Sequence, residues 1–157
     1  MITTSSVERR SPATAIPVLR DLALLLGRIG LAALMIAHAV LEYEFGGGSL
    51  AGVVRLFEQA GIPLAPLTGP GNLLLEAVGG VAILLGLGVP VIGVLMALNM
   101  LGAWVLVHPT PMYVMDHSGP ETVIAIGLLS LVLAVTGSGR FGLDHLIARR
   151  VRARRAG

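Results

Sequence analysis

The chain has 157 residues, of which 55% are hydrophobic and only 13% are charged, and its mean hydropathy is +0.86. Soluble domains carry about 25% charged residues, so the composition excludes an ordinary soluble domain and indicates a protein in a lipid bilayer. The length suits one domain of a few membrane spans, without a separate soluble catalytic domain. The chain has no cysteine, which excludes thiol chemistry, a disulfide and a thiolate metal site. Any redox role therefore needs a cofactor or thiols from a partner.

The charged residues are distributed unevenly, although the net charge is only +2. All eleven basic residues are arginine, and most lie before the first apolar run or after the last one: Arg9, Arg10, Arg20, Arg149, Arg150, Arg152, Arg154 and Arg155. Arginine clusters beside membrane spans usually remain in the cytoplasm and contact anionic lipid headgroups. We therefore expect the tail to contact membrane lipids, and we expect no nucleic-acid partner.

The first half of the chain predicts a polar segment, a membrane span and a short helix. Residues 1–17 are polar and rich in Ser and Thr, which is typical of a cytoplasmic N-terminal segment. Residues 18–41 predict the first span, because about 20 apolar residues cross the hydrocarbon core as a helix. In the link that follows, SLAGVVRLFEQAG at residues 49–61 places apolar residues at helical spacing behind a capping serine. This pattern predicts an amphipathic helix at the membrane interface.

Three further apolar runs follow the link. The thirty-six residues 72–107 contain one formal charge and are interrupted near the middle by glycine and proline. They predict two spans, at residues 72–88 and 90–107, joined by a tight turn. A fourth span is predicted at residues 120–136, where a proline and an acidic residue mark a helix start.

These elements together predict an all-α fold. Residues 18–144 are expected to form a polytopic membrane four-helix bundle, with the amphipathic interfacial helix between spans one and two. Residues 145–157 are expected to form a basic cytoplasmic tail. Four crossings place both termini on one side of the membrane, and the arginine-rich ends assign that side to the cytoplasm.

Ionisable residues inside the predicted spans indicate a ligand pocket. Counting residues from the span ends places four of them near the outer membrane surface: His38, Glu76, His108 and Glu121. Such residues are costly in lipid, so they usually face the bundle interior and pair with one another. We predict that these four form a pocket centred on Glu76, a carboxyl that must stay protonated or find a partner.

The same count places Arg28 and Asn99 in a deeper polar layer, nearer the cytoplasmic surface. Arg28 is interpreted first as a structural residue that bonds Asn99, backbone carbonyls or a lipid phosphate, and second as a ligand-binding group. The four pocket residues offer nitrogen and oxygen ligands to a metal ion. Their spacing contains no signature such as HExxH, so we predict no metal site. The sequence also lacks a phosphate loop, a nucleotide fingerprint and a hydrolase triad, and no catalytic residue is assigned.

Several short motifs occur in one order along the chain. They are Arg28-Ile29-Gly30, His38, Gly61-Ile62-Pro63, Glu76-Ala77-Val78-Gly79-Gly80, Leu85-Gly86-Leu87, His108, Gly137-Ser138-Gly139-Arg140 and Leu143-Asp144. Over roughly Leu22 to Asp144 this ordered set resembles the DoxX family of small bacterial four-helix membrane proteins, which implies a multi-pass protein of the bacterial inner membrane. One position departs from the family: Glu42 stands where members often have a lysine, so a ligand or partner that uses this lysine is not expected.

The resemblance also implies a function. Family members are grouped with a subunit of thiosulfate:quinone oxidoreductase, and others are described as membrane anchors for thiol- and superoxide-detoxifying enzymes. The resemblance thus implies an accessory or anchor subunit of a membrane oxidoreductase assembly rather than a stand-alone enzyme. Membrane-associated redox proteins are then the expected partners, and a quinone is the candidate ligand near Glu76 and His38.

Two other hypotheses stay open at this point. The chain is alternatively a permeation protein for small molecules, lipids or ions, with Glu76 as a protonatable gate. It is alternatively a purely structural subunit of a larger membrane complex, in which the buried polar groups only specify packing. A homo-oligomer is compatible with each of the three hypotheses.

Overall fold

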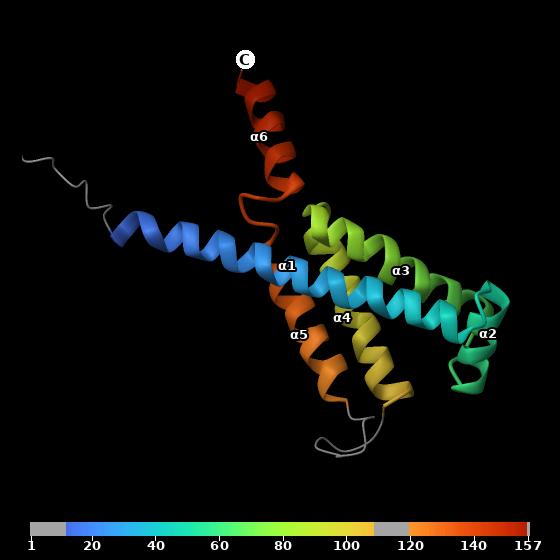
Figure 1. Cartoon of the computed structure of the whole chain (residues 1–157). Helices are drawn as coiled ribbons and strands as arrows, with labels where there is room; N and C mark the ends of the chain where they lie inside the picture. The colour runs from blue at the N-terminus through green and yellow to red at the C-terminus, as the bar shows by residue number, and fades with distance from the viewer. Residues whose placement is uncertain (1–11, 109–119, 157) are drawn as a thin grey trace, which may run out of the picture.

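The computed structural model describes residues 12–108 and 120–156, and the elements in this part of the chain are six helices (Figure 1). They are α1 (Pro12–Phe45), α2 (Leu50–Gln59), α3 (Ala65–Leu85), α4 (Val89–Leu106), α5 (Glu121–Thr136) and α6 (Leu143–Ala156). The predicted all-α fold is confirmed. So is the short helix between spans one and two, because α2 begins directly after Ser49, whose Oγ accepts a hydrogen bond from the backbone N–H of Gly52 at 3.1 Å.

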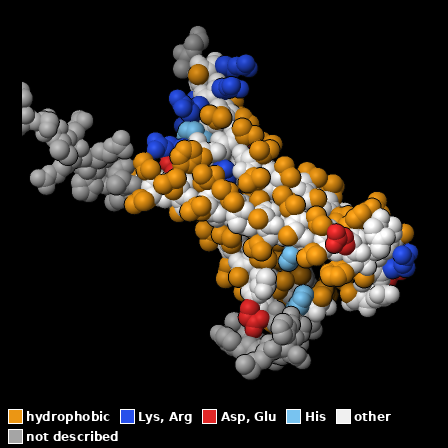
Figure 2. Space-filling view, in the orientation of Figure 1, with side chains coloured by type: hydrophobic (Ala, Val, Ile, Leu, Met, Phe, Trp, Pro, Cys, Tyr) orange, Lys and Arg blue, Asp and Glu red, His pale blue; other side chains and the backbone are white. Residues whose placement is uncertain are grey.

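Three of the described helices are long and apolar enough to cross a membrane: α1 over Pro17–Phe45, α3 and α4. Helix α5 is also apolar but has only 16 residues, about 24 Å of helix. The outward surfaces of these helices are apolar, as Figure 2 shows for one face, and Leu26 and Val135 are 68% and 81% exposed. A soluble protein rarely exposes so large an apolar surface, whereas surrounding lipid covers it.

Two antiparallel pairs are formed by α1 with α3 and by α4 with α5. Figure 1 shows the two pairs crossing, so that they meet at the α3–α4 turn and diverge away from it. We call the end with this turn and the start of α6 the basic end. The opposite end, where α2 packs on α1 and α3 and where α4 ends, is called the cavity end.

Small residues allow the helices of each pair to approach closely. A Cβ at Gly93 of α4 would lie 2.7 Å from the backbone oxygen of Ser130 on α5, and one at Gly80 of α3 would lie 3.0 Å from Ile36 on α1. Backbone approach of this kind is the usual packing mode of membrane helices. Buried apolar side chains fill the space between the pairs: Leu24, Leu31, Ala32, Met35, Ile83, Val89, Met96, Met100, Val123, Ile126 and Leu133.

The predicted break near the middle of residues 72–107 is a turn at the basic end. Gly86 ends α3 with φ +70° and Gly88 precedes α4 with φ +62°. Both are left-handed conformations that side chains other than glycine rarely adopt. A Cβ at Gly86 would also lie 2.5 Å from the guanidinium of Arg28 and from the backbone of Gly142, so this position has no room for any other residue.

The helix ends differ from the predicted span ends. Helix α1 covers residues 12–45 rather than 18–41, and α3 starts at Ala65 rather than at residue 72. Hydropathy marks the part of a helix that lies in lipid, whereas a helix also continues through polar residues at its ends. The start of α3 contains Pro66 in its first turn, where the missing N–H costs no hydrogen bond. The basic tail belongs to helix α6 as far as Ala156.

Candidate functional site

A cavity of about 690 Å³ lies at the cavity end, between α1, α2, α3 and α4. Most of its wall is apolar and includes Leu75, Leu98 and Met100. Two histidines, two glutamates and two asparagines also line it: His38, Glu42, Asn72, Glu76, Asn99 and His108. A mostly apolar cavity of this size with a few polar groups is typical of a small-molecule site.

Glu76 is the most deeply buried of the two carboxyl groups in this cavity. Its side chain is 4% exposed, and its Oε1 accepts a hydrogen bond from Nδ2 of Asn99 at 3.5 Å, the long limit for such a bond. Its Oε2 is buried and has no hydrogen-bond partner in the part of the chain that the structure describes. A buried oxygen without a partner costs about 1–3 kcal/mol, so a ligand that provides this partner gains affinity.

Glu42 is a second carboxyl in the cavity and was not among the four predicted pocket residues. Its Oε2 accepts a short hydrogen bond of 2.6 Å from Nδ2 of Asn72, whereas its Oε1 is buried without a partner among the described residues. A signal for this pair was present in the sequence. Glu42 follows His38 by four residues, and Asn72 precedes Glu76 by four residues, so each pair occupies one face of its helix.

The structure brings three of the four predicted pocket residues to one cavity. His38 comes from α1, Glu76 from α3 and His108 from the end of α4, where its Nδ1 lies 3.3 Å from the backbone oxygen of Ala103. Glu121 is half-buried at the start of α5 and is not among the residues that line the cavity. Among the described residues, no group of three His, Asp or Glu side chains is placed to hold a metal ion.

Arg28 and Asn99, which the residue count placed in one layer, have different partners in the structure. Asn99 belongs to the cavity and bonds Glu76, whereas Arg28 lies at the basic end and bonds backbone carbonyls. The count fails here because it treats the helices as parallel rods. The α1–α3 pair crosses the α4–α5 pair, so equal distances from the span ends do not give equal depths.

Comparison with known protein families finds a match, and the matched range includes the cavity residues. The DoxX family model matches residues 23–109. The chain belongs to the DoxX family. The match ends at residue 109, whereas the resemblance extends to Asp144. The matched range nevertheless runs from α1 to the end of α4 and includes every cavity residue named above. No curated protein and no solved structure matches the chain.

This DoxX protein is a multi-pass membrane protein, and the match ends before α5. The segment that closes the basic end, residues 137–144, therefore lies outside the matched range. This segment is held to the matched part by two side chains: Arg28 of α1 donates to the backbone oxygen of Ser138, and Asp144 accepts from the backbone N–H of Gly88 in the turn between α3 and α4. The basic end is thus held by residues from both inside and outside the matched range.

Arg28 connects α1 to the end of α3 at the basic end. Its side chain is 1% exposed and donates hydrogen bonds to the backbone oxygens of Ser138 at 2.6 Å, Leu84 at 3.1 Å and Phe141 at 3.4 Å. The last carbonyls of a helix lack partners within it and carry partial negative charge. Arg28 therefore caps α3 and ties the segment after α5 to it.

Asp144 caps the start of α4. Its two carboxylate oxygens accept hydrogen bonds from the backbone N–H groups of Gly88 at 2.8 Å and Val89 at 3.0 Å. The first N–H groups of a helix are free donors at its positive end. A residue 55 positions further along the chain than Val89 thus provides the cap of α4, and it fixes the first turn of α6 to the α3–α4 turn.

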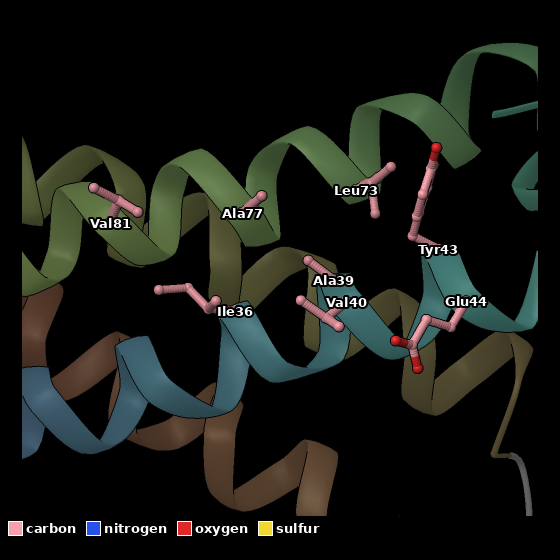
Figure 3. Close-up of a pocket in the computed structure, with 8 residues that line it drawn as sticks. All are labelled: Ile36, Ala39, Val40, Tyr43, Glu44, Leu73, Ala77 and Val81. Atoms are coloured by element: carbon pink, nitrogen blue, oxygen red, sulfur yellow. The ribbon is translucent and has the colours of Figure 1, made fainter. Parts of the chain in front are cut away.

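A second hollow lies between α1 and α3 and differs from the cavity in polarity (Figure 3). It has a volume of about 420 Å³, and small and branched apolar side chains form most of it. Tyr43 and Glu44 lie at one end, where Glu44 is exposed. No buried carboxyl of the described residues lines this hollow, which we call the apolar groove. It offers a ligand apolar contacts but no buried acceptor that lacks a partner.

Proposed function

We propose that this DoxX protein is an accessory membrane subunit of an oxidoreductase assembly, and that its cavity holds the headgroup of a quinone. The observation that carries the proposal is the free Oε2 of Glu76, buried in a mostly apolar cavity of about 690 Å³. A quinone headgroup combines an apolar ring with two oxygens at opposite edges. Such a molecule fits a site that is apolar with a few polar groups.

The residues of the cavity suit both oxygens of such a ring. The free oxygens of Glu76 and Glu42 accept hydrogen bonds from the hydroxyl groups of a reduced quinone. His38 and His108 each carry two ring nitrogens, which accept or donate according to the tautomer. When bound, the quinone would supply two-electron chemistry, while the carboxyl groups and histidines would orient the ring and hold its protons.

The accessory role follows from what the sequence lacks. The chain has no cysteine and no nucleotide-binding fingerprint. Electrons exchanged with a quinone in the cavity would therefore pass to or from a cofactor of a partner protein. We place the basic end in the cytoplasm, because arginine-rich segments beside membrane spans usually stay there. The cavity then opens towards the outer leaflet of the bacterial inner membrane.

The proposal has a direct test in ligand binding. Trp104 is the only tryptophan of the chain and follows Ala103, which lines the cavity. Short-chain ubiquinone and menaquinone analogues should quench its fluorescence saturably in the full-length protein in mild detergent. The absence of saturable quenching would overturn the quinone part of the proposal.

The assembly part of the proposal is tested by extracting the protein from its native membrane and measuring which proteins accompany it. A stoichiometric redox enzyme or cytochrome is expected, and recovery of the chain alone would overturn this part.

A second candidate function is permeation of a small organic cation. It is supported by the charge of the cavity, whose described lining contains two glutamates and no arginine. Uptake of a lipophilic cation into proteoliposomes that is lost in Glu76→Gln would favour permeation over the quinone subunit. Against it stands the basic end, where Arg28 and the residues that it bonds close the bundle.

A further inference from the structure

Helix α6 projects from the basic end and packs along no other helix in the described part of the chain (Figure 1). Its sequence, LDHLIARRVRARRA, combines exposed apolar side chains with five arginines. Leu146, Ile147 and Val151 are 48%, 49% and 44% exposed. In Figure 2 most of the basic side chains lie on α6 and at its junction with the bundle. This uncovered apolar stripe lies next to a cluster of positive charge. A binding partner would therefore offer both apolar contact and negative charge.

The position of these side chains around the helix defines two sides. At 100° per residue, Leu143, Ile147 and Val151 fall on one side together with Leu146. Arg149, Arg152 and Arg155 fall on the other side or at its edges, while Arg150 and Arg154 continue the apolar stripe towards the C-terminus. A long arginine side chain can bury its methylene groups among apolar groups and still reach a phosphate with its guanidinium.

The root of α6 is fixed at the level where the spans end. Asp144 in the first turn binds the backbone N–H groups of Gly88 and Val89, and its own N–H donates to the oxygen of Gly86 at 2.9 Å. The turn between α3 and α4 marks the end of two apolar spans, so α6 starts at the membrane boundary. Arg149 lies only about 9 Å further along the helix from Leu143, which is about one Debye length.

We propose that α6, which projects from the basic end in Figure 1, turns onto the bilayer surface where anionic lipid is present, with Leu146, Ile147 and Val151 at the acyl boundary and its arginines on anionic lipid headgroups. Charge complementarity and position favour lipid over a protein partner. The cytoplasmic leaflet, at which we place the basic end, carries anionic headgroups, and each arginine near its surface strengthens attachment roughly fivefold. The proposal is independent of the cavity and of what the cavity binds.

The chain has no cysteine, so a single introduced cysteine gives a unique site for a spin label. We would compare Ile147→Cys with Ala148→Cys in the full-length protein, because the two neighbours differ by about 100° around the helix and neither removes an arginine. Label accessibility to oxygen and to a water-soluble relaxation agent would be measured in lipid discs of phosphatidylcholine alone and of phosphatidylcholine with phosphatidylglycerol.

In discs with phosphatidylglycerol, the label at 147 should gain oxygen access and lose aqueous access, while the label at 148 stays in water. In phosphatidylcholine alone both labels should stay in water. Replacing Arg149, Arg152 and Arg155 together by Gln should abolish the effect of phosphatidylglycerol, with a roughly fivefold loss for each arginine. Equal aqueous access at both positions in both discs would overturn the proposal. Protection of position 147 from both agents in both discs would also overturn it and would indicate a protein, such as a second copy, on α6.

Discussion

Arg28 and Glu76 are both almost fully buried, with 1% and 4% of their surfaces exposed, yet the fold satisfies them differently. The guanidinium of Arg28 donates to three backbone oxygens, and only its Nε lacks a partner among the described residues. The carboxyl of Glu76 accepts one hydrogen bond of 3.5 Å, and its second oxygen has no partner there. The first group closes the basic end, and the second faces a cavity.

The difference separates a structural charge from a binding group. A buried polar group whose hydrogen bonds are made within the chain holds helices together, and removing it leaves its partners unpaired. A buried polar group with an unused oxygen destabilises the free protein, and folds retain such groups mainly at functional sites. The sequence favours a structural Arg28 and a ligand pocket at Glu76, but the hydrogen-bond partners that separate the two groups are set by the fold.

The largest effect is expected for Arg28→Leu. The substitution leaves the oxygens of Leu84 and Ser138 without their donor, at about 1–3 kcal/mol for each, so we expect a loss of roughly 3 kcal/mol in the free energy of unfolding. Unfolding in mixed micelles of increasing SDS content measures it. Arg28→Lys keeps the charge and should lose less. If Arg28→Leu is as stable as the wild type, Arg28 is not a structural residue and the contrast with Glu76 does not hold.

Asp144→Ala should have the next largest effect on stability. The variant removes the cap on the N–H groups of Gly88 and Val89, which is typically worth ~1–2 kcal/mol. The same unfolding measurement applies, with His145→Ala as the matched control on the next residue. Asp144→Asn keeps one acceptor and should fall between the two. If Asp144→Ala and His145→Ala unfold alike, the cap does not stabilise the basic end.

The sequence predicts the four apolar runs, their break at Gly86–Gly88 and the short helix after Ser49, because span length, glycine and a capping side chain are local signals. It does not predict how the helix pairs cross. For that reason it placed Asn99 with Arg28 rather than with Glu76, and it did not find the cap that Asp144 provides from the far end of the chain. Contacts between residues so distant in sequence depend on packing angles that no local pattern encodes.

The predicted pocket shows the same limit on a smaller scale. His38, Glu76 and His108 were found because each is an isolated polar residue near a span end. Glu42 was placed just after the first predicted span, residues 18–41, yet helix α1 continues to Phe45 and carries Glu42 into the cavity. Once a helix is known to continue, the spacing of four residues from His38 to Glu42 is enough to place both on one face.

Glu76→Gln tests the same comparison through ligand affinity. The amide keeps the shape of the side chain but replaces one acceptor oxygen with an NH₂ donor, so the affinity for a reduced quinone analogue should fall about tenfold, which corresponds to about 1.4 kcal/mol. Stability should stay equal or rise, in contrast to Arg28→Leu. Quenching of Trp104 and unfolding in SDS measure the two quantities. Glu44→Gln, on the exposed end of the apolar groove, is the control. A variant that loses stability with unchanged affinity would make Glu76 structural.

The smallest effect, and the sharpest contrast, is expected for Glu42→Lys. An ammonium group at this position brings three donors on a flexible stem into a cavity where Glu76 has a free oxygen, and a hydrogen bond to a charged group there contributes about 1.5–3 kcal/mol. The substitution also removes the acceptor of the Asn72 side chain, which costs about 1–3 kcal/mol, so the free energy of unfolding should stay within about 1 kcal/mol of the wild-type value. The new bond occupies the oxygen that a ligand needs, so affinity should fall while stability stays near that of the wild type. Glu42→Gln, which brings no cation, should lower affinity less. If Glu42→Lys instead binds the quinone analogue as the wild type does, the free oxygen of Glu76 is not where the ligand binds, and the two buried charges differ only in how well the fold satisfies them.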